Sequence, residues 1–198
     1  QTLWGGIEEY YGTSSQNSLS NFRQVVSGAY SIKEIDLAKE DIPEGLNTLV
    51  IAGPREKFSD YELFKIDQFL MKGKSLALFI DSFVEGTTYS EQYSGATSYV
   101  PLSTGIEKLL EHYGVTVRKS YVMDENCYKQ EPQQGSSGGR QEYYFIPMID
   151  NAFIGKELSM MRDIKGLVMS KVSPVEVTED VLKINKIKAY PLISSSDR

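Results

Sequence analysis

The chain has 198 residues, of which 40% are hydrophobic and 24% are charged, a composition typical of a globular domain that can bury a sizeable core. Its formal net charge is −6 and its pI is near 5.0, which disfavours nucleic acid or an anionic membrane as a partner because both need clustered lysine and arginine. No stretch approaches the ~18 apolar residues that would span a bilayer.

The single cysteine and the single histidine restrict the disulfides, metal sites and catalytic triads that the chain could form. The chain has one cysteine, Cys127, and one histidine, His112, so it cannot form an internal disulfide or a zinc site built from several Cys and His ligands. A catalytic triad with a histidine would have to use His112. We therefore predict no metal site and no cofactor.

The first predicted elements are a strand at 3–7, a helix that begins near residues 17–20 and a strand at 30–37. The helix carries apolar residues at helical spacing on one face, namely Leu19, Phe22, Val25 and Val26. A polar connector, KEDIPEG, follows the second strand. No signal peptide is visible, and the chain opens at Gln1 without a methionine. We therefore expect an excised segment with anchors outside it.

The clearest signals lie in LNTLVIAGPREKFSDYELFKIDQFLMKGKSLALFID. Thr48–Ala52 is a continuous apolar run, typical of a strand that is covered on both faces. Ser59 and Glu62 have the spacing of a capping box, and Gly73 is placed to end the helix that they begin. A second apolar run at 76–80 follows. This order predicts a right-handed βαβ unit with parallel strands.

The sequence patterns that predict helices and strands become weaker after this βαβ unit. Residues 82–102 are rich in Ser, Thr, Gly and Tyr without a strong period, so we expect a long surface loop. A second capping box, Thr104 and Glu107, predicts a helix that ends at Gly114, and a strand follows at 115–123. Residues 128–142 are polar and low in complexity, which predicts a flexible loop.

Beyond that loop we predict a strand at 143–149, a helix at 154–164, and strands at 166–172 and 187–192. The alternation of strands and helices predicts a single α/β domain over 1–198, with its core in 1–127 and a C-terminal part at 143–198. The expected architecture is three-layered and doubly wound around a mainly parallel sheet, flavodoxin-like or class I glutamine amidotransferase-like.

In such sheets, ligands bind beyond the carboxyl ends of the strands. The residues at these positions form the candidate rim: Gly5, Gly6, Glu8, Gly53, Pro54, Asp81, Ser82 and Asp124. The Gly53-Pro54 turn is interpreted as scaffold, because proline removes a backbone donor and no glycine-rich phosphate motif is present. Ser82 lacks the glycines of a nucleophile elbow, and an acid such as Asp81 more often caps a turn.

Five tyrosines lie in segments that look polar and exposed: Tyr10, Tyr11, Tyr89, Tyr93 and Tyr99. Tyrosines on loops supply rigid contact area for a partner protein or a sugar. Alternatively, they close the edge of the core with their hydroxyl groups in water. The sequence leaves both interpretations open.

Several segments carry a family resemblance. LWGGIEE at 3–9, LVIAGPREKFSDYELFKIDQFLMKGKSLALFID at 49–81, GIEKLLEHYGVTVRKSYVMD at 105–124 and AYPLISSSDR at 189–198 are similar to the auxiliary component of ABC transporters of the gliding-motility type. The segment with Ala-Gly-Pro is the most distinctive. At the first turn, Gly6 stands where the family has a histidine.

The resemblance implies a non-catalytic binding and assembly domain on the periplasmic side of the bacterial inner membrane, in a protein anchored by other segments. Its partners would be ABC-transporter membrane subunits, another auxiliary protein, an exported substrate or a glycan. It implies no catalytic residues. The alternatives are a divergent amidotransferase-like hydrolase that uses Cys127 or Ser82 with His112, and a glycan-binding domain that uses the tyrosines.

Overall fold

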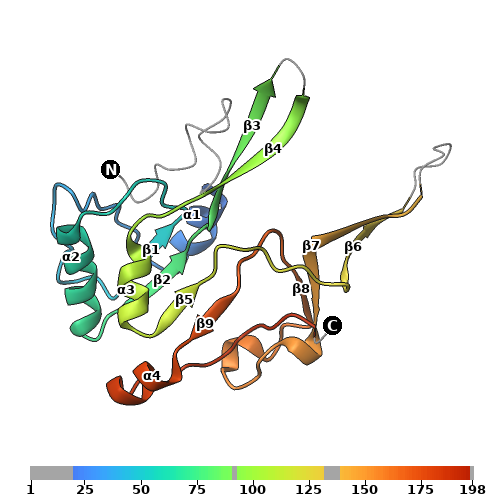
Figure 1. Cartoon of the computed structure of the whole chain (residues 1–198). Helices are drawn as coiled ribbons and strands as arrows, with labels where there is room; N and C mark the ends of the chain where they lie inside the picture. The colour runs from blue at the N-terminus through green and yellow to red at the C-terminus, as the bar shows by residue number, and fades with distance from the viewer. Residues whose placement is uncertain (1–19, 91–92, 132–138, 197–198) are drawn as a thin grey trace. The chain divides into compact units, whose positions relative to one another are not determined.

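The computed structural model describes residues 20–90, 93–131 and 139–196 (Figure 1). The chain divides into two compact units, Gln1–Leu110 (unit 1) and Glu111–Arg198 (unit 2), and each is described by itself. Unit 1 contains α1 (Ser20–Ser27), β1 (Thr48–Ala52), α2 (Asp60–Met71), β2 (Ser75–Phe79), β3 (Phe83–Ser90) and β4 (Tyr93–Pro101). The helix α3 (Ile106–His112) spans the boundary between the units.

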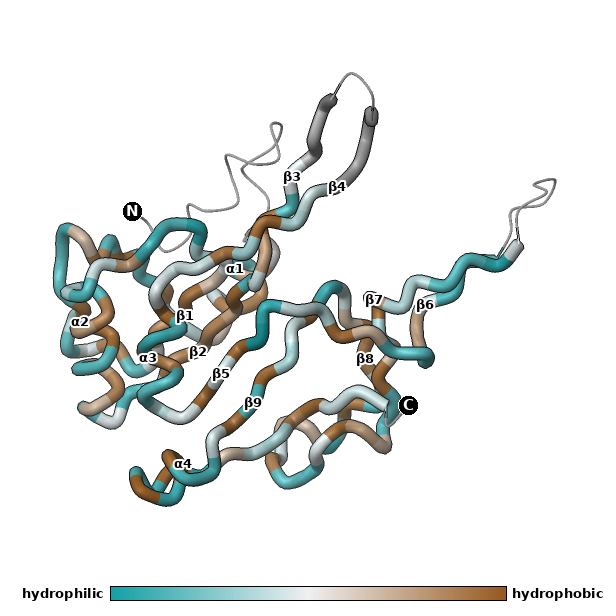
Figure 2. Tube along the Cα trace, in the orientation of Figure 1, coloured by the Kyte–Doolittle hydropathy of each residue, from teal (hydrophilic) through white to brown (hydrophobic). Residues whose placement is uncertain are grey.

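The βαβ unit predicted from sequence is confirmed. Strands β1 and β2 pair in parallel, from Thr48 opposite Ser75 to Ala52 opposite Phe79, and Figure 2 shows apolar residues along both strands. The helix α2 begins at the capping box of Ser59 and Glu62 and is followed by Gly73 at φ +76°. Glycine adopts this left-handed conformation without the steric cost that a Cβ would add.

The core of unit 1 lies between α2 and the parallel strands. Ile51 and Ile66 are completely buried, and Leu49, Leu63 and Phe69 are at most 9% exposed. The inward residues of α2 recur at a spacing of three, which places them on one helical face. Burial of these side chains supplies the main stabilisation of this region, at about 1.5–3 kcal/mol for each.

Two predictions for unit 1 are wrong. The stretch 82–102 is not a loop, because β3 and β4 form an antiparallel hairpin from Phe83 opposite Pro101 to Ser90 opposite Tyr93. Its β-branched and aromatic residues favour strands, although the small polar residues between them hide the pattern. The stretch 30–37 forms no strand. It is irregular, and it buries Ile35 and Leu37 without a paired neighbour.

Unit 2 contains only antiparallel pairs among its described residues. Strands β5 (Val115–Val117) and β9 (Val175–Val177) form one pair. Strands β6 (Cys127–Gln130), β7 (Gln141–Asp150) and β8 (Gly166–Val168) form a sheet in that order. Short 3-10 turns η1 (Asn151–Phe153) and η2 (Ser159–Met161) and the helix α4 (Glu179–Asn185) complete the unit.

The predicted fold class is therefore wrong. Within the described ranges, only β1 and β2 pair in parallel, and the other pairs are antiparallel in small sheets. The sequence analysis extended one clear βαβ unit to the whole chain. Polar stretches such as 128–142, taken there for a loop, instead supply the paired strands β6 and β7 at their ends.

The weaker elements of unit 2 are also revised. The strand at 143–149 is confirmed within β7, while the strands at 115–123 and 166–172 shorten to β5 and β8. The predicted helix at 154–164 is replaced by the turns η1 and η2, and 187–192 forms no strand. The elements β9 and α4 were not predicted. They are short, and short elements carry little periodicity.

The last described residues of the chain are joined to the centre of unit 2. Ile154 and Ile193 form an isolated antiparallel bridge, and the Gly155 N–H donates to the Leu192 carbonyl at 2.9 Å. Leu192 packs against a cluster formed by Ile149, Ile154 and Met161. The segment 192–196 is thus part of the packed structure of this unit.

Candidate functional site

The carboxyl ends of β1 and β2 meet at one edge, as parallel pairing requires. Gly53 follows β1 at φ +57°, and its N–H donates to the Phe79 carbonyl at 2.7 Å. Pro54 is buried after it. Asp81 and Ser82 follow β2. The structure therefore brings four of the predicted rim residues, Gly53, Pro54, Asp81 and Ser82, to one edge of unit 1.

The most informative residue of this edge, Arg55, was not predicted from the sequence. Its Nη2 lies 3.2 Å from Oδ2 of Asp81, and the two side chains are 23% and 54% exposed. Nε and Nη1 of Arg55 are buried without a hydrogen-bond partner. A basic residue directly after the Gly-Pro turn and an acid directly after the next parallel strand was the signal that could have identified this pair.

Burial of the Arg55 donors without a hydrogen-bond partner costs free energy. A buried donor without an acceptor loses its hydration and costs about 1–3 kcal/mol, and more when it carries charge. Asp81 offsets only part of this desolvation cost, since it engages one of the five N–H groups that a guanidinium carries. The edge thus presents a half-exposed carboxylate beside an arginine with unused donors, an arrangement suited to binding a polar group.

Ser82 does not resemble an exposed nucleophile. The residue is only 4% exposed, and its carbonyl accepts a hydrogen bond from the Leu102 N–H at 2.9 Å. This bond closes the base of the β3–β4 hairpin. Ser82 therefore has a structural role at the start of β3.

Asp124, the remaining described rim residue, belongs to unit 2 and is bonded to its own chain. Its carboxylate is 3% exposed and accepts from the Ser196 hydroxyl at 2.5 Å, the Ser196 N–H at 2.8 Å and the Asn126 N–H at 2.8 Å. Burial raises the pKa of this carboxyl, but the bonds from Ser196 and Asn126 outweigh it and hold the pKa below its usual value. Asp124 thus anchors the segment 192–196.

The other predicted residues are placed as follows. Gly5, Gly6, Glu8, Tyr10 and Tyr11 lie outside the described residues. Tyr89 lies in β3 and Tyr93 in β4, but neither has a described side chain. Tyr99 is 45% exposed on β4, opposite Glu85.

The residues of the alternative hydrolase lie in different surroundings. Cys127 is a free cysteine, 2% exposed, at the start of β6. His112 is exposed at the end of α3, where its ring contacts Tyr113 edge to face at a centroid distance of 5.6 Å. In the part of the chain that the structure describes, no group of three or more His, Cys, Asp or Glu residues could hold a metal ion. No described helix is long and apolar enough to cross a membrane.

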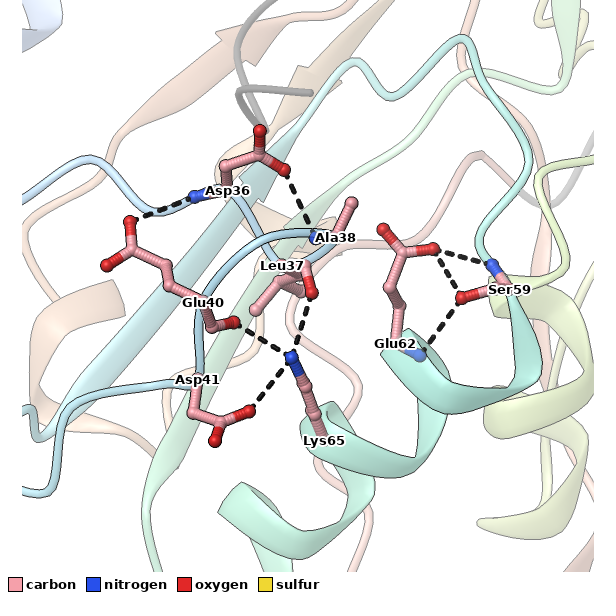
Figure 3. A network of polar contacts seen from close by, with 8 residues as sticks. All are labelled: Asp36, Leu37, Ala38, Glu40, Asp41, Ser59, Glu62 and Lys65. Carbon is pink, nitrogen blue, oxygen red and sulfur yellow. Dashed lines mark hydrogen bonds and ion pairs between the residues drawn. The ribbon is translucent and has the colours of Figure 1, made fainter.

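A polar network beside α2 has a structural role (Figure 3). The Lys65 ammonium donates to the carbonyls of Leu37 and Glu40 at 3.0 and 2.9 Å and pairs with Asp41 at 2.8 Å. The hydrogen bond to Asp41 raises the pKa of Lys65, although burial opposes it. Lys65 therefore holds residues 36–44 against the helix; this stretch, which overlaps KEDIPEG at 39–45, is the acidic connector of unit 1.

Comparisons with known proteins can now be set beside this geometry. A family model described as an ABC-type uncharacterized transport system matches residues 6–198. A similar solved structure is titled "mmIFT52 N-terminal domain", with a TM-score of 0.52 and 19% identity, covering 81% of this chain and 65% of that one. The chain thus spans less than two thirds of that structure's length. No curated protein matches.

The structural likeness concerns the fold alone at this level of identity. It is a likeness to an IFT52 domain, and the small, mostly antiparallel sheets of this chain differ from the mainly parallel sheet that the sequence predicted. The family match covers nearly the whole chain and includes both units.

Proposed function

Because the chain belongs to the family described as an ABC-type uncharacterized transport system, we propose that it is a non-catalytic binding and assembly domain of an auxiliary transport protein. The proposal includes the finer assignments of the resemblance: a gliding-motility-type component on the periplasmic side of the inner membrane, anchored by segments outside this one. Its partner is a membrane subunit of the transporter or another auxiliary protein.

One observation of the structure supports binding at the carboxyl edge of β1 and β2. Arg55 keeps two buried donors without a partner while its third nitrogen faces Asp81. Native structures leave few buried polar groups unpaired, so each such group calls for an explanation. A partner group that enters this edge as the arginine shifts, accepts hydrogen bonds from its uncovered donors and donates one to Asp81 provides such an explanation.

The test is co-purification of the full-length protein with the other transporter components from detergent-solubilised membranes, quantified by mass spectrometry. We expect Arg55→Gln and Asp81→Asn each to reduce recovery of the ATP-binding-cassette components by about tenfold, equivalent to 1.4 kcal/mol. Arg118→Gln is the matched control, since Arg118 pairs with Glu176 through exposed side chains. Equal recovery with all three variants would contradict binding at this edge.

A second assay addresses catalysis. Turnover of esters or amides by the purified chain that is lost on Cys127→Ala or Ser82→Ala would contradict a non-catalytic role. The location is tested with a reporter enzyme that is active only outside the cytoplasm, fused to the full-length protein. An inactive reporter in a correctly expressed fusion argues against the periplasmic assignment.

A further inference from the structure

The helix α2 has an apolar face on each side. Its inward face supplies Leu63, Ile66 and Phe69 to the core. On the opposite side, Tyr61, Phe64 and Met71 are 61%, 55% and 73% exposed. Their spacing of three and seven residues places these three side chains on one stripe of the helix. Exposed apolar groups that cluster in this way on a soluble surface commonly mark an interaction site.

The two aromatic rings of the stripe lie in a nearly parallel, stacked arrangement. The ring centroids of Tyr61 and Phe64 are 6.4 Å apart, and their planes differ by only 18°. Aromatic and methionine side chains are enriched in protein interfaces, because they bury a large area with few rotatable bonds. The stripe therefore has the composition of a contact surface.

One border of the stripe is acidic. The Lys65 ammonium lies 4.7 Å from the centroid of the Tyr61 ring. It also pairs with Asp41 (Figure 3), so it joins the stripe to the connector 36–44. This connector contains four acids, Asp36, Glu40, Asp41 and Glu44, and one basic residue, Lys39. Lys39 pairs with Asp36 at 2.7 Å, and Lys33 pairs with Glu40 at 3.5 Å.

Two carboxylates of this border, those of Asp41 and Glu44, are exposed to solvent. The side chain of Lys65 is only 11% exposed, whereas that of Asp41 is 81% exposed. Glu44 is exposed as well. The lysine therefore fixes the connector in place while the carboxylates of Asp41 and Glu44 remain accessible. A partner with positive charge would gain association rate and orientation from this arrangement.

We propose that the outer face of α2 and the acidic connector together bind an amphipathic helix of a partner protein, with an apolar stripe bordered by lysine or arginine. The apolar stripe of the partner would lie on Tyr61, Phe64 and Met71, and its basic border would face Asp41 and Glu44. A helix of α2's 12 residues is about 18 Å long, so the partner helix needs some three to four turns. This surface does not include Arg55 or Asp81, so its test is independent of the function proposed above.

The probe is a fluorescent amphipathic peptide of about 18 residues, built from leucine and lysine at helical spacing. Its control is the same peptide with glutamate in place of lysine. Binding to the 198-residue chain is followed by anisotropy. We expect the lysine peptide to bind and the glutamate peptide to bind at least tenfold more weakly. Equal binding of the two peptides would overturn the proposal.

Variants locate the site. We expect Phe64→Ser to weaken binding about tenfold, as truncation of an interface anchor does. The double variant Asp41→Asn with Glu44→Gln should weaken it about threefold and reduce its salt dependence. The matched controls are Ile184→Ser, at a side chain 79% exposed on α4, and Glu131→Gln, at a side chain 73% exposed. If the controls weaken binding as much as the test variants, the peptide binds elsewhere and the proposal fails.

Two further measurements test whether a second copy of the chain or a membrane occupies the outer face of α2. Sedimentation of the chain alone would reveal self-association, and flotation with anionic vesicles would reveal membrane binding. If either occurs and is lost in Phe64→Ser, the face is occupied by a second copy or by a lipid surface, and the proposal is wrong. Unaltered thermal unfolding of the variants shows that the fold is intact.

Discussion

The β1–α2–β2 region and the region that ends at residue 196 are stabilised in different ways. The first is local: a capped helix packs its buried face on two strands that lie within 32 residues of one another along the chain, counting from Thr48 to Phe79. The second depends on contacts between distant residues, such as Asp124 with Ser196, which are 72 positions apart. Contacts of the first kind leave signals in neighbouring residues, whereas those of the second kind do not.

The strongest test of the local region is the removal of its buried centre. Ile66→Ala should lower the free energy of unfolding of unit 1 by about 2–5 kcal/mol, because Ile66 is completely buried between α2 and the strands. Segment-resolved hydrogen exchange would show the loss at β1, α2 and β2. Ile184→Ala makes the same change at an exposed helical position, and it should have little effect. Similar effects of the two variants would contradict the described core.

Gly155→Ala tests the distant contacts. A Cβ at Gly155 would collide with the Pro191 carbonyl, so the backbone must shift and the bond to Leu192 must lengthen. We expect a loss of about 1–3 kcal/mol, as for overpacking, with faster hydrogen exchange in 191–196. Gly139→Ala is the control, since nothing lies within 4 Å of its added Cβ. Unchanged exchange in 191–196 would show that this segment is not fixed by the contact.

Asp124→Asn tests the contacts between distant residues through the pH dependence of stability. The folded pKa of Asp124 is lowered, so its carboxylate stabilises the fold above the unfolded pKa of about 3.9 and loses this effect as the pH falls through the folded pKa. The asparagine variant should be about 1–3 kcal/mol less stable at neutral pH, because an amide N–H group would face a donor of Ser196. Its stability should also fall less steeply below pH ~4.

The measurement for Asp124→Asn is urea unfolding across this pH range. Asp163→Asn removes the same charge from an exposed position of unit 2, and it should retain the steep acid dependence of the parent chain. A parallel pH dependence in all three proteins would mean that Asp124 does not control the acid sensitivity of this unit.

The same contrast explains what could be predicted from the sequence. The capping box of Ser59, the apolar runs and Gly73 are local signals, and they predicted β1, α2 and β2 with nearly correct bounds. The pairing of β5 with β9 joins residues far apart in the chain, such as Val115 and Val177, and the polar hairpin of β6 and β7 was taken for a loop, so the parallel fold class was wrong. The strand ends were predicted, but Arg55 was not singled out, although its place after β1 and that of Asp81 after β2 follow from the parallel pairing.

The buried thiol of Cys127 can report on local opening of unit 2. It is the only cysteine in the sequence, and it is 2% exposed in β6. A thiol reagent reaches such a group only in open states, so the labelling rate follows either the rate of opening or the population of open molecules. Comparison of the rate at low and high reagent concentration separates the two regimes. The rate or the population of local opening in unit 2 can therefore be measured in the unmodified protein.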